Sequence, residues 1–293
     1  MSKVYDGKLS TPTLSAMRLA TALLTGALVK YPEKSTLNEH FNLLTNRIPA
    51  GTERPTIKYL CIGNRGHVAK TEADGFTDFV PVGKVANASG MFNAVPFVLR
   101  EVDNDLSDEQ RKNYAFRTRM TINTRNYWAY YLKRIDMRTV ETSDYLITKA
   151  GTTQTIVDHV YTDKELFPNP TELPDYDYDD DSRIDIPDGR YVTSNADIKI
   201  LFDEFDVQEY MNVTSIMRGS ARSSVISEIA LASGIDGVAT GESATGSQFS
   251  YDEALGVQVM YYITLYSNLA ITNENLNMTV KIGQSAPFFI GAV

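Results

Sequence analysis

Side chains near the middle of the chain alternate between a mainly apolar and a mainly polar side. In residues 114–122, one side carries Tyr114, Phe116, Thr118, Met120 and Ile122 and the other carries Arg117, Arg119 and Thr121, which is the period of a half-buried β-strand. Residues 127–135 alternate again after the polar stretch 123–126, so we predict an antiparallel hairpin. A capping box of Ser107 and Gln110 favours a helix running toward this segment, and that alternative stays open.

The same period returns near the C-terminus. Residues 257–265 carry apolar or aromatic side chains on both faces, which is typical of a strand covered on both sides. In residues 276–282 apolar and polar positions alternate, so one face of that strand should be exposed. The Asn-rich residues 268–275 would connect the two as antiparallel neighbours. A shorter strand is predicted at residues 56–62.

Helical spacing dominates the first third of the chain. Residues 14–31 and 36–48 both show apolar positions three or four apart, and each run is followed by a proline, which disfavours the helical conformation of the residue before it. A further helix is predicted between Asp203 and Met217, and Gly219 should end it.

The acidic stretch 166–190 separates these regions. Prolines remove donors from a sheet ladder and neighbouring aspartates repel, so this stretch is expected to form an exposed loop. The predicted fold class is α+β: β-rich antiparallel sheets, an N-terminal pair of helices and a long acidic Pro-containing loop. The predicted regions are a mixed helix and strand region at 1–165, the loop at 166–190, and a helix with C-terminal strands at 191–293 that pack on the first region.

Composition and charge argue against nucleic acid and membranes as partners of the chain. An apolar content of 43% and a charged content of 22% are close to globular averages. A formal net charge of -9 repels a phosphate backbone, so we expect no nucleic-acid partner. The sequence contains neither the apolar core of a secretory signal nor a run of about 18 apolar residues, so we expect folding in a cytoplasm and no membrane contact. Cys61 is expected to be a buried core thiol.

The acidic stretch is also the one candidate cation site. Asp175, Asp177 and Asp179 match the alternating oxygen ligands of a calcium loop. Asp180 stands where such a loop requires glycine and Ile186 where it requires glutamate. A solvated loop is therefore the favoured interpretation, with an irregular calcium site or a contact for a basic partner as alternatives.

No motif in the sequence specifies a catalytic chemistry. His40, His67 and His159 do not have zinc-ligand spacing. The segments 63–66 and 241–246 resemble phosphate-binding loops but lack the lysine, so both are interpreted as turns. We expect no catalytic residue, metal or cofactor and therefore no enzyme, although a hydrolase using scattered carboxylates stays open because carboxylate separation is spatial.

Aromatic residues provide the candidate interface. They concentrate in the two alternating segments, and tyrosine and tryptophan suit surfaces that are apolar on one side and hydrogen-bonded on the other. Ordinary packing within a sheet explains the same enrichment equally well. The candidate interface residues are Tyr127, Trp128, Tyr130, Tyr261, Tyr262 and Tyr266.

A family resemblance adds a possible assembly. The chain resembles structural proteins of tailed-phage virions, most of all baseplate-wedge or other tail proteins of contractile-tail phages. The resemblance lies in the segment Glu228–Gly234, the sequence Tyr251–Ala254 and the strands within 257–282. The likeness covers about the last quarter of the chain and the segment Asn113–Tyr131. It implies a β-rich subunit, present in several copies in a symmetric assembly with other virion proteins and located in the virion after assembly in the host cytoplasm. A neck, collar or capsid-associated position is the alternative, and a calcium-dependent binding module is a further one.

Overall fold

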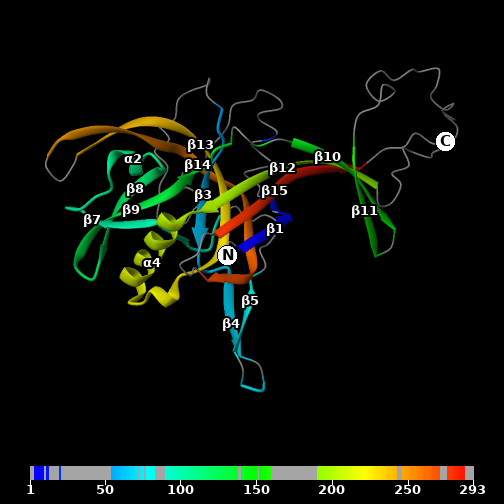
Figure 1. Ribbon diagram of the computed structural model, residues 1–293, viewed down its shortest axis with the longest axis horizontal. Helices are drawn as coiled ribbons and strands as arrows, with labels where there is room; N and C mark the ends of the chain where they lie inside the picture. Colours follow the sequence, from blue (N-terminus) through cyan, green and yellow to red (C-terminus); the bar gives the residue numbers. More distant parts are fainter. Residues whose placement is uncertain are drawn as a thin grey trace. The chain divides into compact units, whose positions relative to one another are not determined.

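The structure is a computed structural model dominated by β-sheets (Figure 1). It describes residues 3–9, 11–12, 20, 54–71, 73–75, 77–82, 90–137, 140, 142–150, 152–159, 190–242, 246–270 and 276–287. The chain forms two compact units. Unit 1 comprises Met1–Asp6, Ser10–Arg138 and Ile200–Met278, and unit 2 comprises Gly7–Leu9, Thr139–Lys199 and Thr279–Val293.

An eight-stranded sheet forms the centre of unit 1. Its principal order is β2 (Thr11–Pro12), β14 (Gln248–Ala270), β13 (Val225–Glu242), β3 (Thr56–Gly63), β9 (Arg125–Arg134) and β7 (Val98–Glu101). In addition, β6 (Ala94–Val95) pairs with β3, and β8 (Tyr114–Ile122) pairs with β9. The core lies where β13 is flanked by β3 and β14, and side chains on all three strands are almost fully buried there.

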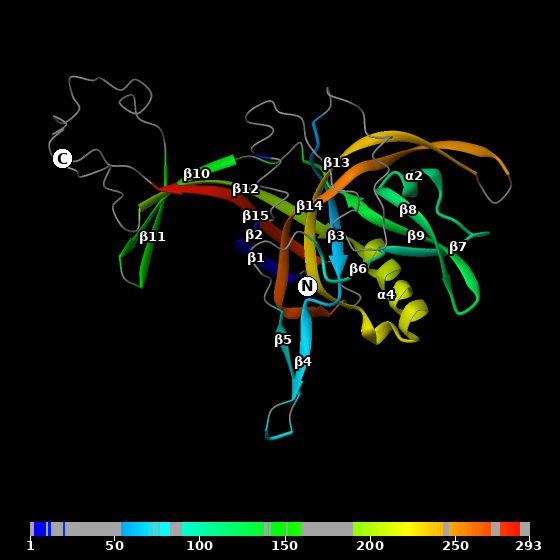
Figure 2. The same ribbon diagram turned by 180° about the vertical axis from the view of Figure 1, so that it is seen from behind.

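The strands β13 and β14 continue beyond this core as a two-stranded ribbon. Residues 235–242 of β13 pair with residues 248–255 of β14, whereas β3 pairs only with the part of β13 that ends at Gly234. We call residues 235–242 with 248–255 the arm. In Figures 1 and 2 the arm extends over α2 (Asp108–Arg111) and β8.

The helix α4 (Glu204–Arg218) packs beside β7 in unit 1. It begins with a capping box between Asp203 and Asp206 and ends at Gly219, whose φ of 75° is the left-handed conformation that glycine adopts without strain. The hydroxyl of Tyr210 donates a hydrogen bond of 2.9 Å to the carbonyl of Val225 and so ties the helix to β13. The helix predicted between Asp203 and Met217 is confirmed.

A separate hairpin, β4 (His67–Thr71) with β5 (Thr77–Pro81), forms a two-stranded sheet of its own in unit 1. Both ribbon views show it projecting away from the larger sheet (Figures 1 and 2). At its base, the amide of Val82 donates to the carbonyl of Gly66 at 2.8 Å.

Unit 2 contains most of a five-stranded sheet. The order is β1 (Lys3–Leu9), β15 (Leu276–Pro287), β12 (Arg190–Phe202), β10 (Thr142–Ala150) and β11 (Thr153–Asp158). Antiparallel ladders join β10 to both β11 and β12. Within unit 2, the hydroxyls of Thr193 and Ser285 lie 2.7 Å apart.

The predicted fold class is wrong. The described residues are mainly antiparallel β-sheet, and α2 and α4 are the α-helices with bounds among them, so an α+β class with an N-terminal helix pair is not the fold. The two stretches predicted as that pair, 14–31 and 36–48, lie outside the described residues apart from the helical Ala20. The acidic loop 166–190 also lies outside them except for Arg190, and the predicted regional division stays a prediction.

The predicted strands exist, but one predicted pairing does not. The hairpin of β8 and β9 and the strand β3 are confirmed, and the capping box at Ser107 ends after the single turn of α2. The strands β14 and β15 lie in different sheets, so residues 268–275 do not join neighbours. Both faces of β14 are covered as expected, but its antiparallel partner is β13, whose glycines and alanines obscure the alternation.

Candidate functional site

Charged and aromatic side chains gather where the arm lies against α2, β8 and β9. Arg117 on β8 is at the centre of this cluster, and its side chain is only 7% exposed. Its guanidinium donates to the carboxylate of Asp105 at 2.9 Å and lies 4.0 Å from the ring centre of Trp128. On the arm side it lies 5.1 Å from the ring of Phe249 and 5.5 Å from that of Tyr251. One buried cation therefore joins the arm to the sheet.

The carboxylate of Asp105 is held from several sides. It accepts a hydrogen bond of 2.5 Å from the hydroxyl of Tyr130, and Arg111 of α2 approaches it at 3.6 Å. Burial raises the pKa of Tyr130, and its hydrogen bond to the carboxylate raises it further, so the phenol stays a donor. Arg111 also lies 4.3 Å from the ring centre of Phe249. Two arginines thus hold the same aromatic side chain of the arm.

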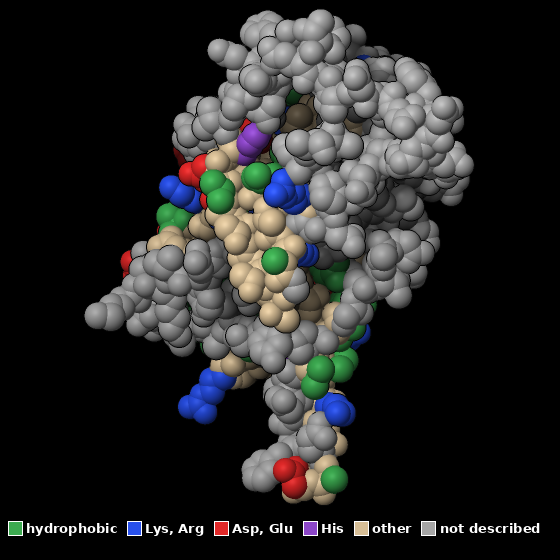
Figure 3. Space-filling model, turned by 90° about the vertical axis from the view of Figure 1, so that its right-hand side faces the viewer, with side chains coloured by type: hydrophobic (Ala, Val, Ile, Leu, Met, Phe, Trp, Pro, Cys, Tyr) green, Lys and Arg blue, Asp and Glu red, His purple; other side chains and the backbone are tan. Residues whose placement is uncertain are grey.

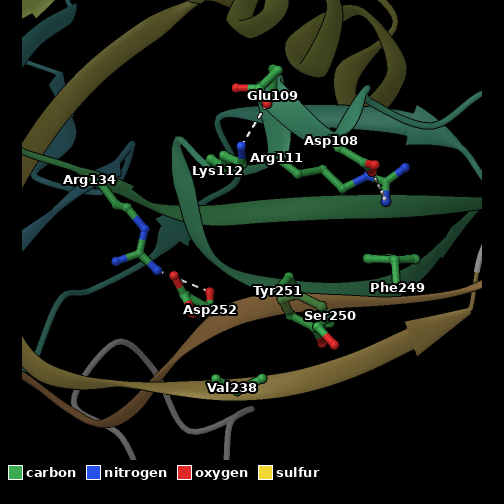
Figure 4. A pocket seen from close by; sticks show the side chains of 10 residues that line it. All are labelled: Asp108, Glu109, Arg111, Lys112, Arg134, Val238, Phe249, Ser250, Tyr251 and Asp252. Atoms are coloured by element: carbon green, nitrogen blue, oxygen red, sulfur yellow. Dashed lines mark hydrogen bonds and ion pairs between the residues drawn. The ribbon is translucent and has the colours of Figure 1, made fainter.

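A pocket of about 440 Å³ opens between α2 and the arm. Figure 4 shows its lining: Asp108, Glu109, Arg111, Lys112, Arg134, Val238, Phe249, Ser250, Tyr251 and Asp252. Each cation in it has a partner within the chain. Lys112 pairs with Glu109 at 2.6 Å, Arg111 pairs with Asp108 at 3.2 Å, and Arg134 donates to the carbonyl of Asp252 at 3.0 Å (Figure 4). These pairs leave the pocket suited to apolar contact through Val238, Phe249 and Tyr251.

Asp236 anchors the base of the arm. Its carboxylate accepts hydrogen bonds from the hydroxyl of Tyr59 at 2.7 Å, from Arg134 at 2.5 Å and from Lys58 at 3.1 Å. Burial alone would raise the pKa of Asp236, but these three donors stabilise the charged form and lower it overall. The result is an ionised anchor between β3, β9 and the arm.

Two further carboxylates are buried where α4 meets the sheet. Asp206 is paired with Lys133 of β9, and Glu209 is paired with Arg100 of β7. Burial raises the pKa of both carboxyls, their cation partners oppose that rise, and repulsion from neighbouring carboxylates adds to it. Neither carboxylate lines the pocket, so their position supports a role in holding α4 in place.

The glycines of segment 63–66 have a packing role. A Cβ on Gly66 would lie 2.2 Å from the carbonyl oxygen of Ser227, and one on Gly63 would lie 2.7 Å from a carboxylate oxygen of Glu228. Glu228 is 0% exposed and accepts from the amides of Phe92 and Asn93 at 2.9 and 3.1 Å. A buried carboxylate beside the segment repels phosphate, so the turn interpretation fits the structure.

The described residues contain no group of three or more His, Cys, Asp or Glu side chains that could hold a metal ion. The candidate calcium ligands Asp175, Asp177 and Asp179 lie outside the part of the chain that the structure describes, as does His40. No helix in that part is both long and apolar enough to cross a membrane. Cys61 is buried, and burial raises the pKa of its thiol, as expected for a core thiol.

Comparison with known proteins gives one finding. A family described as a family of unknown function, DUF7208, matches residues 1–293. The chain belongs to the DUF7208 family. No curated protein and no solved structure matches it. The DUF7208 match includes the residues of the arm and of the pocket.

Most of the candidate interface residues of this DUF7208 member are buried in the structure. Four of them are buried by the chain itself: Tyr127, Tyr130, Tyr261 and Tyr262. Trp128 is half-buried, with Arg117 at 4.0 Å and Arg119 at 5.0 Å from its ring centre. The side chain of Tyr266 lies outside those described. This placement supports sheet packing for the four buried tyrosines, and the interface role stays a prediction.

Sequence reasoning missed the residues that form the cluster. The alternation of β8 puts Arg117 on the polar face, yet the arm covers that face and buries the guanidinium. The sequence carried no local signal for this contact, and the glycine that marks it is recognisable only once the ladder is known. Gly241 lies opposite Phe249 in the ladder, and a Cβ there would lie 2.8 Å from its ring and 2.9 Å from the guanidinium of Arg117. A glycine facing an aromatic residue on the neighbouring strand indicates such close packing.

Proposed function

We propose that the chain is a structural subunit of a tailed-phage virion, located in the baseplate as a wedge-type component, and that it acts through protein–protein contacts during tail assembly. The resemblance of Glu228–Gly234, Tyr251–Ala254 and the C-terminal strands to such proteins supports the particle. The observation that supports an assembly role is a pair of thin hairpins that expose apolar side chains.

The first hairpin is β4 with β5. Val68 and Val80 lie opposite each other in its ladder and are 55% and 36% exposed. A two-stranded hairpin in water is only marginally stable, and exposed apolar area is favourable to cover, by about 25 cal/mol per Å². Figure 3 shows this hairpin at the bottom of the view, with hydrophobic side chains on its surface. Such a projection suits insertion between neighbouring subunits.

The second hairpin is β10 with β11 in unit 2. Every residue of β11 is exposed, including Ile156 at 57% and Val157 at 55%. Among the described residues, unit 1 and unit 2 therefore each carry a hairpin with two exposed large apolar side chains. Single exposed apolar residues are ordinary, but apolar positions repeated on projecting hairpins are typical of contact surfaces.

The charged groups favour the same proposal. The cations of the pocket are paired, and the buried carboxylates of α4 are paired with Lys133 and Arg100. General acid–base catalysis requires a group that can reach a substrate in a pocket with a pKa near the working pH. The arrangement is instead that of side chains that fix the positions of the arm and of α4.

Mass spectrometry and gold labelling of purified virions test the proposal. We expect the chain at a fixed copy number in particles from its own source, with label at the baseplate. Label at the neck, collar or capsid would overturn the baseplate position and keep the virion role. A chain that is absent from particles, strictly monomeric and without affinity for virion components would overturn both.

A further inference from the structure

The strand β11 lies at one edge of its sheet. It is the last strand of the five-stranded sheet, and among the described strands it pairs with β10 alone. All six of its residues, Thr153–Asp158, are exposed. Natural edge strands are usually protected by lysine, proline, a bulge or a covering segment. The sequence of β11 contains neither lysine nor proline, and its ladder with β10 is regular.

An apolar row crosses the sheet and stops at this edge. In the ladders, Ile147 of β10 lies opposite Tyr191 of β12 and opposite Ile156 of β11. Residues directly opposite each other share one face, so the three side chains form one row. The row ends at Ile156, which is more than half exposed. A strand added to this edge would continue the row if it placed an apolar residue opposite Ile156.

We propose that β11 pairs with β11 of a second copy of this chain, antiparallel and across a two-fold axis at Ile156. A two-fold axis perpendicular to a sheet keeps each residue on its own face, so a residue on the axis meets its own counterpart. Ile156 then lies opposite Ile156 of the second copy and joins the two apolar rows across six strands. Thr155 lies opposite Val157, and Gln154 lies opposite Asp158, whose carboxylate the Gln154 amide can reach.

The side chains of β11 select this register over its neighbours. An axis at Val157 would place Ile156 opposite Asp158, and an axis at Thr155 would place Ile156 opposite Gln154. Both would end the apolar row against a polar side chain. The axis at Ile156 also places no like charges opposite each other, because Asp158 is the only charged residue of β11.

The pairing alone is small. Six residues of edge bury less than the roughly 1,000 Å² of a stable interface, so the contact needs copies held close together. In this respect the inference rests on the proposed function, which supplies several copies in one assembly. In solution we expect weak dimerisation, with a fraction of dimer that rises with protein concentration.

Cysteine cross-linking tests the register. In the paired strands, the two Cβ atoms at position 156 lie about 4.5–5.5 Å apart, close enough for a disulfide after small adjustments. The matched control is position 154, on the same strand and face, where the two copies would be separated by four residue steps, about 13 Å. The native Cys61 is buried and does not compete. The variants Ile156→Cys and Gln154→Cys are oxidised as purified full-length chains at high concentration.

We expect a disulfide-linked dimer of Ile156→Cys, with the 156–156 peptide identified by mass spectrometry, and at least tenfold less dimer of Gln154→Cys. Absence of the Ile156→Cys dimer, or equal yields from both variants, would overturn the proposal. Protection from hydrogen exchange, in the dilute monomer, of the β11 amides that point away from β10 would also overturn it, because the chain itself would then cover the edge.

A charge substitution provides a second measurement. Ile156→Lys places two lysines opposite each other across the axis, so we expect self-association in analytical ultracentrifugation to weaken at least tenfold. The control Val238→Lys adds the same charge to another exposed strand, in the arm, and should leave self-association unchanged. Equal effects of both substitutions would overturn the register.

Failure of this pairing can be distinguished from failure of the proposed function. A chain that is found in virions but does not cross-link would contradict only the pairing. A chain that cross-links but is absent from virions would contradict only the proposed function.

Discussion

At the residue scale, the contact that matters most to the arm is the buried guanidinium of Arg117. It pairs with Asp105 and lies against Trp128, Phe249 and Tyr251. We predict that Arg117→Met lowers the free energy of unfolding by about 1.5–3 kcal/mol, because the buried carboxylate of Asp105 loses one charged donor while Tyr130 and Arg111 remain. Urea unfolding measures this loss.

The matched control for that substitution is Arg125→Met. Arg125 pairs with Glu101 at 3.1 Å, but its side chain is 72% exposed, so we expect a loss of at most about 1 kcal/mol. Equal losses in the two variants would show that Arg117 contributes no more than a surface ion pair.

Asp236 makes the stability of the folded chain depend on pH in the acidic range. Its pKa in the folded chain lies below the ordinary value of 3.8 because Tyr59, Arg134 and Lys58 donate to the carboxylate. A lowered pKa means that the stabilisation is present in full above the unfolded value and is lost as the pH falls through the folded value. We predict that Asp236→Asn is less stable than the native chain at neutral pH and that this difference shrinks below pH 3.8.

Unfolding measured by fluorescence between neutral and acidic pH tests this difference. The exposed Asp103 serves as the control, because Asp103→Asn removes the same charge without removing this set of donors. A difference between Asp236→Asn and the native chain that stayed constant with pH would contradict the account.

At the element scale, the turn between β3 and β4 depends on the size of Gly66. Its amide donates to the hydroxyl of Ser227 at 2.8 Å, and a Cβ would lie 2.2 Å from the Ser227 carbonyl oxygen. The backbone of Ser227 cannot move aside as a flexible side chain can. We therefore predict that Gly66→Ala lowers the free energy of unfolding by about 1–3 kcal/mol. Thermal unfolding measures the loss.

The control for Gly66→Ala is Gly75→Asn in the same region. Gly75 has a φ of 85°, a Cβ added there would meet no atom within 4 Å, and asparagine tolerates this left-handed conformation. We expect a small effect there. A mild effect of Gly66→Ala would mean that β13 yields to the added methyl group.

Local signals explain which elements could be predicted from the sequence. The hairpin of β8 and β9 and the helix α4 carry their own alternation, capping residues and terminal glycine, so the sequence predicts them. The strand β13 carries small residues such as Gly234 and Gly237, because Tyr59 and Leu255 pack closely against them. Those small residues hide the alternation of apolar and polar positions along β13. The sequence therefore did not predict β13 as the partner of β14, nor the arm that the two strands form.

The candidate site was less predictable for the same reason. The burial of Arg117 depends on Phe249 and Tyr251, which are more than 130 positions away in sequence but adjacent in the fold. No local pattern encodes that contact. Conversely, aromatic alternation in β9 and β14 reflects burial in the core as much as it would an interface, so it could not separate the two roles.

At the scale of the whole molecule, two hairpins carry exposed large apolar side chains, Val68 and Val80 on one and Ile156 and Val157 on the other, while the cations of the pocket are paired internally. A chain built in this way gains free energy from covering its hairpins and has few free charges in the pocket to bind a small ion there. The candidate calcium ligands lie outside the described residues, but Asp180 and Ile186 stand where a calcium loop requires glycine and glutamate. The proposed assembly role and the calcium-dependent binding module make opposite predictions for the effect of calcium on the stability of the isolated chain.

We therefore predict that calcium leaves the melting temperature of the purified chain unchanged. A site saturated at 100 times its dissociation constant would add about 2.7 kcal/mol and raise the melting temperature by roughly 5–10 °C for a chain of this size. Magnesium at equal concentration is the control, because both ions screen the net charge of -9 alike. A rise with calcium alone would contradict the prediction and favour a calcium site in the acidic stretch 175–188, whereas equal small shifts with both ions would reflect screening.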